Sequence, residues 1–140
     1  MNTKENIKEY KVLENGDELI IDNNFRYHLF RNEEELTKGI EALKAQSYHN
    51  NYWKYRDLNN FEHLFDTNGI ELTKDIKTMW VEAYANGYWK YMTKEGFWQL
   101  CNDKNVCITK DPSIFSITVF PNGDWEYKLT EWAIPIYVRK

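Results

Sequence analysis

Residues 35–70 read ELTKGIEALKAQSYHNNYWKYRDLNNFEHLFDTNGI, and residues 71–106 read ELTKDIKTMWVEAYANGYWKYMTKEGFWQLCNDKNV. Aligned without a gap, the two stretches are identical at thirteen of 36 positions. The identities include the ELTK that opens each stretch and the YWKY in its middle. A period of this length predicts an array of similar structural units.

The same period extends in both directions along the chain. A further step of 36 residues carries Asn86-Gly87 onto Asn122-Gly123, and a step back carries Asn59-Asn60-Phe61 onto Asn23-Asn24-Phe25. At 140 residues the chain has the size of one domain. We therefore predict a single repeat domain of about four copies, with approximate bounds 1–34, 35–70, 71–106 and 107–140.

The last copy carries the strongest local signal of secondary structure. Residues 116–120 alternate apolar and polar side chains, and residues 125–129 alternate again after Pro121-Asn122-Gly123-Asp124. An Asn-Gly pair between two such runs is typical of a β-hairpin, because both residues accept the positive φ of a type I′ turn. The last copy is thus predicted to contain a hairpin.

The alternation of the last copy is also found in the two copies before it. Ile117 corresponds to Val81 and Ala45, and the neighbouring positions are more polar, which is the pattern of a half-buried strand. Turn residues such as those at 93–96 and 102–105 divide each copy into about four short strands. The predicted fold is mainly β, with about four tandem 36-residue antiparallel hairpin or meander repeats. These form either a propeller-like ring or a continuous twisted meander.

A helical array is the rival interpretation of the period. Leu36, Ile40 and Leu43 have helical spacing, and the residues between them favour a helix. The last copy opposes this interpretation, because Pro112 and a β-branched run occupy the equivalent positions. We expect strands in every copy and a single helix near residues 33–46 as the one deviation.

Composition narrows the classes of function. The formal net charge is −4 with both signs spread through all copies, which disfavours a nucleic-acid partner. The first residues have no apolar leader, and no run of eighteen apolar residues occurs, so we expect a cytoplasmic protein without a membrane partner. The excess of Lys over Arg and the abundant Asn indicate a bacterial or phage source.

The chain has few residues arranged for chemistry. His28, His49 and His63 lack the spacing of zinc ligands, and structural roles are expected for the equivalent His28 and His63. Cys101 and Cys107 flank a turn, across which they can face each other, and free thiols are expected. No nucleotide-binding or hydrolase motif is present. We therefore predict no catalytic residue, no metal site and no cofactor.

Aromatic side chains make up 16% of the sequence, and they supply the candidate binding residues. Trp53, Trp89 and Trp125 each lie two residues before a Tyr, and we assign these pairs to the core. The surplus rings on the opposite face are candidates for an exposed surface that binds a partner or ligand. This predicted aromatic surface consists of Tyr52, Trp80, Tyr84, Tyr88 and Trp98.

Three functions remain open at this point. Repeats provide extended contact surfaces and no unique acid–base pair, so a non-catalytic protein that binds a protein partner is favoured, for example a phage- or mobile-element-encoded inhibitor. The second is a module that binds or sequesters a small ligand, a sugar or nucleotide, in repeated aromatic pockets. The third is a small enzyme with an unrecognised site.

Overall fold

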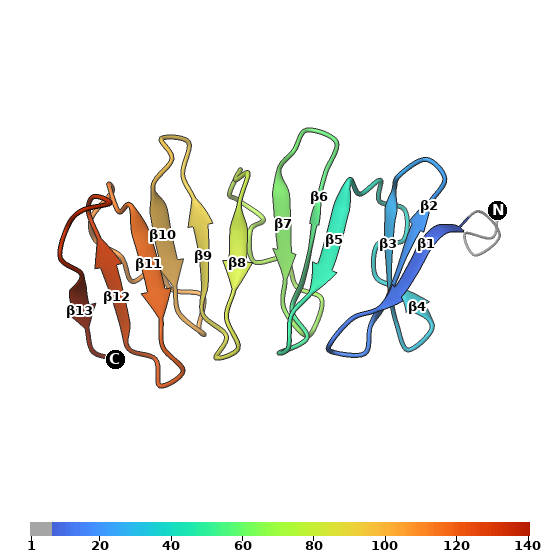
Figure 1. Ribbon diagram of the computed structural model, residues 1–140. Coiled ribbons are helices and arrows are strands. Elements are labelled where there is room, and N and C mark those ends of the chain that lie inside the picture. Colours follow the sequence, from blue (N-terminus) through green and yellow to red (C-terminus); the bar gives the residue numbers. More distant parts are fainter. Residues whose placement is uncertain (1–6) are drawn as a thin grey trace. The chain divides into compact units, whose positions relative to one another are not determined.

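A computed structural model describes residues 7–140, which contain thirteen strands and no helix. The strands form four separate antiparallel sheets that follow one another along the chain (Figure 1). The fold is therefore all-β with tandem antiparallel sheets, as the repeat predicts. No helix in residues 7–140 is long and apolar enough to span a membrane.

The chain divides into two compact units, one ending at Ile76 and the other beginning at Lys77. Each unit contains two of the four sheets. The first sheet ends at Glu35, one residue past the predicted bound of the first copy. A single repeat domain stays a prediction, and the two units are described separately below.

The first unit contains two sheets in which each strand pairs with its neighbour in the sequence. An isolated bridge between Tyr27 and Ala42 joins the end of one sheet to the segment that enters the next. The first sheet consists of β1 (Ile7–Val12), β2 (Glu18–Asp22), β3 (Tyr27–Arg31) and β4 (Glu34–Glu35), and the second of β5 (Lys44–Ser47), β6 (Trp53–Arg56) and β7 (Glu62–Phe65).

The second unit has the same local order. Its strands again pair only with their sequence neighbours, which is the topology of a meander. The third sheet consists of β8 (Val81–Ala83), β9 (Trp89–Met92) and β10 (Trp98–Cys101), and the fourth of β11 (Ser116–Val119), β12 (Trp125–Lys128) and β13 (Ile136–Val138).

The fourth strand that we predicted for each copy is short. In the first sheet it is the two-residue β4, and in the next two copies it is reduced to single bridges, Phe65 with Glu71 and Cys101 with Cys107. The pairing is limited to Glu71 in one copy and Cys107 in the other. Two residues later, each copy has a buried threonine, Thr73 or Thr109. The first sheet thus has four strands, and the next two have three strands with a residual fourth pairing.

The predicted hairpin in the last copy is present, but its turn differs from the prediction. Gly123 has a φ of 93°, whereas Asn122 is not among the residues of positive φ. Gly123 N–H donates to Phe120 O, and Phe120 N–H donates to Asp124 O, so the loop has three residues with one left-handed position. The type I′ assignment is wrong. The Asn122 side chain instead accepts a hydrogen bond from Asp124 N–H at 2.9 Å.

The predicted helix near residues 33–46 is also wrong. The segment contains β4, a turn and the start of β5. Glu33 has a φ of 69° and Gly39 a φ of 78°, and neither value is compatible with a right-handed helix. Leu36 N–H donates to Leu29 O at 2.8 Å, so tertiary pairing takes the backbone groups that a helix needs.

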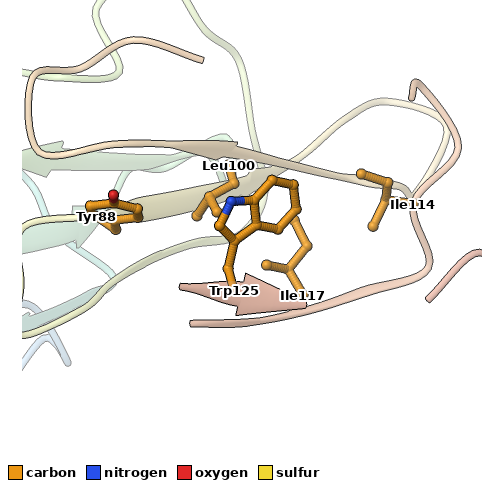
Figure 2. Close-up of a cluster of buried hydrophobic side chains, with 5 residues drawn as sticks. All are labelled: Tyr88, Leu100, Ile114, Ile117 and Trp125. Atoms are coloured by element: carbon orange, nitrogen blue, oxygen red, sulfur yellow. The ribbon is translucent and has the colours of Figure 1, made fainter. Parts of the chain in front are cut away.

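The tryptophans assigned to the core are buried. Trp53, Trp89 and Trp125 have exposed fractions of 4%, 2% and 5%. Trp53 stacks on Phe65 with ring centroids 4.2 Å apart in the first unit. In the second unit, Figure 2 shows the Trp125 indole at the centre of a cluster of buried side chains that includes Leu100. The repeated Trp is therefore a core residue in all three copies.

Replacing one of these indoles with a methyl group tests this assignment. We expect Trp89→Ala to lower the free energy of unfolding by about 3–5 kcal/mol, because it leaves a large cavity in the core. Trp132→Ala is the matched control, since that ring is 88% exposed, and its effect should stay within about 0.5 kcal/mol. Urea unfolding followed by circular dichroism measures both values. Equal losses for the two variants would contradict the burial of Trp89.

Candidate functional site

The five residues of the predicted aromatic surface differ in their exposure. Tyr88 is 6% exposed and belongs to the core cluster of the second unit, so the expectation that it faces solvent is wrong. Tyr84 and Trp98 are half-buried against the same cluster, and Tyr52 is half-buried in the first unit. Trp80 is 48% exposed and is the one member with a largely free ring.

Tyr84 and Trp98 lie around an internal cation. The Nζ atom of Lys90 is 4.6 Å from the ring centroid of Trp98 and 5.8 Å from that of Tyr84. The same amine donates a hydrogen bond to Ile117 O at 3.1 Å. Burial lowers the pKa of Lys90, and the nearby Glu82 carboxylate offsets part of this effect. The faces of these two rings are therefore used within the unit.

In the preceding copy, the equivalent lysine amine is paired with a carboxylate. Lys54, which is equivalent to Lys90, places its Nζ atom 2.9 Å from Glu62 Oε1. Trp98 stands at the position of Glu62, so an aromatic ring takes the place of this acid, and Lys90 has another carboxylate nearby, Glu82 Oε2 at 3.7 Å. The Trp98 ring thus contacts the Lys90 amine, and its role in binding stays a prediction.

Two histidines form matching networks with carboxylates in the first unit. His28 is 2.9 Å from Asp22 Oδ2 through Nε2 and 2.8 Å from Glu35 Oε2 through Nδ1. His63 makes the same contacts with Asp57 and Glu71, at 2.8 and 2.9 Å. The two histidines are thus equivalent, and the offset of one residue between them reflects a shorter turn in the first copy.

The third copy contains a neutral version of this network. Gln99 takes the place of histidine, and Cys107 takes the place of the second carboxylate. Thr109 donates its hydroxyl proton to Gln99 Oε1 at 2.7 Å and accepts the Leu100 N–H at 3.2 Å. The network is charged in two copies and neutral in the third. This variation is typical of a structural role.

The histidine networks change the ionisation of their members. Burial by itself lowers the pKa of His28, but the hydrogen bonds and charges of Asp22 and Glu35 outweigh it, so the pKa lies above its ordinary value. His63 behaves in the same way with Asp57 and Glu71. The unfolded chain lacks these partners. Protonated histidine therefore stabilises the folded state, and this contribution is lost as the pH rises through the raised pKa.

We expect the urea midpoint of the protein to be highest with both imidazoles protonated and to fall as the pH rises above about 6.5, the ordinary histidine pKa. The double variant His28→Gln/His63→Gln, which introduces the residue that the third copy carries naturally at position 99, should flatten this dependence. His49→Gln is the control, because its side chain is 71% exposed and contacts only the exposed Glu14. A pH profile unchanged in the double variant would contradict the assignment.

The two cysteines face each other across the turn after β10, as the sequence predicts. Cys101 and Cys107 form an isolated bridge of the backbone, and both thiols are free. Burial raises the pKa of Cys101 to about 12, so this thiol stays protonated at neutral pH. Within residues 7–140, no group of three or more His, Cys, Asp and Glu side chains has an arrangement that could hold a metal ion.

The most exposed apolar side chains lie in the loop between β12 and β13, residues 129–135, which we call the β12–β13 loop. Trp132 is 88% exposed and Ile134 is 87% exposed. Our sequence analysis did not single out these residues. A signal was available, because Trp132 stands where the two preceding copies carry Gly96 and Asn60 in turns.

The second unit also has an open cavity of about 400 Å³ beside the core cluster. Its wall includes the rings of Tyr88 and Trp125. Charged side chains also line it, among them the basic Lys104, Arg139 and Lys140. The sequence period does not reveal this cavity, since its lining residues come from distant parts of two copies.

The fold is similar to that of two solved WD40 structures. The WD40 β-propeller domain of Doa1 matches 96% of this chain and 51% of that chain, with 13% sequence identity and a TM-score of 0.46. The C-terminal WD40 domain of Sif2 matches 94% of this chain and 45% of that chain, with 8% identity and a TM-score of 0.45. The chain thus spans about half the length of each, and the similarity concerns the fold alone.

No family model matches the chain. A comparison with curated proteins also finds no match.

Proposed function

We infer that the protein is a non-catalytic interaction module that binds a protein partner through the β12–β13 loop. The observation that carries this proposal is the exposure of Trp132 and Ile134, at 88% and 87%. An exposed tryptophan beside an exposed branched aliphatic side chain offers the apolar area and the ring type that dominate binding hot spots.

The state of the titratable groups supports a binding role. His28 and His63 are each held between two carboxylates, and the Lys54 amine contacts the buried Glu62. Cys101 is kept protonated by its burial. These groups stabilise the sheets, and a nucleophile with an adjacent free base is not found among them.

The other parts of the proposal follow from the sequence. The net charge of −4 suits a protein partner better than a nucleic acid or an anionic membrane. A cytoplasmic location and a role as a phage- or mobile-element-encoded inhibitor belong to the same proposal. Within the predicted aromatic surface, Trp80 is available for a second contact, and its role in binding stays a prediction.

Site-specific crosslinking tests the protein-binding role. A photoreactive phenylalanine analogue at position 132 should give one defined adduct with a host protein, because a partner that covers the loop would exclude water from this ring. The same analogue at position 94, in the exposed turn after β9, is the matched control. Mass spectrometry identifies the adduct.

In the same experiment, Ile134→Ala should reduce the yield of the adduct at position 132 and leave the unfolding midpoint unchanged, since its side chain contributes little to the core. Equal adduct patterns at positions 132 and 94 would refute binding through this loop.

Binding of a small ligand is the second candidate function, and the cavity of the second unit favours it. Its volume of about 400 Å³ falls within the usual range for small-molecule sites. The predicted repeated aromatic pockets differ from this cavity, which combines rings with basic side chains.

A further inference from the structure

The cavity of the second unit has an apolar wall and a basic rim. Ile108, Trp125 and Val138 form the apolar part. The rim includes the exposed turn after β10, with Lys104, and the residues after β13, with Arg139 and Lys140. A site of this construction suits a ligand with an apolar body and a negatively charged group.

The three basic side chains of the rim are not neutralised by ion pairs. In the part of the chain that the structure describes, Lys104, Arg139 and Lys140 form no ion pair within 4 Å. Asp103 on the rim and the neighbouring Asp124 are the opposing acids.

The neighbouring Asp124 carboxylate already has protein partners. Asp124 Oδ2 accepts the Tyr137 hydroxyl at 2.5 Å and the Asn122 amide at 3.1 Å, and Oδ1 accepts the Lys140 backbone N–H at 3.0 Å. These bonds fix the chain after β13 against the β11–β12 turn. The side chain of Lys140 passes over Gly123, where a Cβ atom would lie 2.7 Å from its Cδ. The backbone of Lys140 is therefore anchored beside the β11–β12 turn.

Tyr88 places a hydroxyl in the wall of the cavity. Its side chain is only 6% exposed and lines the cavity, and its hydroxyl forms no hydrogen bond with residues 7–140. The Tyr88 oxygen is not one of the buried polar atoms that lack a partner, so it is open to the space of the cavity. A ligand oxygen in the cavity would accept the proton of this hydroxyl.

We propose that this cavity binds a small phosphate monoester with a nonpolar or ring-containing body. The phosphate lies at the rim, where Lys104, Arg139 and Lys140 provide charge and the Tyr88 hydroxyl donates a hydrogen bond. The body packs against Ile108, Trp125 and Val138. A phosphate suits this site better than a single carboxylate because three cations match a doubly charged group with three acceptor oxygens.

The proposal gives the second candidate function a ligand class and does not depend on the protein-binding role. Calorimetry of the purified full chain with AMP, inorganic phosphate, adenosine and citrate tests it without any protein partner. AMP should bind more tightly than inorganic phosphate or citrate, and adenosine should give no heat. The AMP affinity should fall as salt is raised, because the contacts are charged.

Two pairs of variants locate the site. Tyr88→Phe should weaken AMP binding about tenfold or more, which is typical for a hydrogen bond to a charged group. It should leave the unfolding midpoint unchanged, because no hydrogen bond within the protein is lost. Tyr91→Phe removes a hydroxyl outside the cavity and should bind like the wild type. Lys104→Ala should weaken binding, whereas Lys94→Ala in the preceding turn should not.

Three results would overturn the proposal. The first is the absence of heat with both AMP and inorganic phosphate at low ionic strength. The second is equal binding of AMP and inorganic phosphate, or of AMP and citrate, which would remove the assigned ligand class. The third is an unchanged AMP affinity in Tyr88→Phe. A loss of crosslinking at position 132 has no bearing on these outcomes, so the two functions fail separately.

Discussion

The central leucine of the third strand in each of the first three sheets has a buried backbone N–H that depends on one threonine hydroxyl. Leu29, Leu64 and Leu100 donate to the Oγ1 atoms of Thr37, Thr73 and Thr109, at 3.1, 3.0 and 3.2 Å. The residual fourth pairing is too short to supply a complete ladder, and an unpaired amide at a fully buried position would be costly. Each threonine therefore closes its sheet and allows the chain to leave for the next one.

The residues around each threonine vary while this bond stays constant. In the first two copies a carboxylate, Glu35 or Glu71, accepts the threonine hydroxyl and also holds a histidine. In the third copy the amide oxygen of Gln99 accepts it. The same geometry is thus built from ionisable groups twice and from neutral groups once. The copies preserve an acceptor for the threonine hydroxyl, but in the third copy it is uncharged and comes from the position that carries histidine in the second copy.

Much of the fold could be predicted from the sequence, because strand alternation and Asn-Gly turns are local signals that the period repeats. The burial of Trp53, Trp89 and Trp125 followed from the same logic. The helix near residues 33–46 was a wrong prediction because Leu36, Ile40 and Leu43 have helical spacing, although left-handed residues interrupt the segment. Local periodicity cannot show that Leu36 N–H pairs with Leu29 O instead.

The candidate sites were less accessible to sequence reasoning. A period draws attention to residues that recur, such as Tyr84 and Tyr88, and recurrence here marks packing more than exposure. Trp132 departs from the period and was therefore missed. The basic cavity combines Lys104 with Arg139 and Lys140, and only the folded second unit places these residues on one rim. The candidate sites lie where the copies differ.

Because both histidine networks lie in the first unit, the two units are expected to differ in how their stability depends on pH. Both occur before Ile76, while the second unit has the glutamine-centred counterpart. A rise in pH through the raised histidine pKa is therefore expected to destabilise the first unit more than the second. Repeats of one fold can in this way differ in how strongly acidity controls their stability.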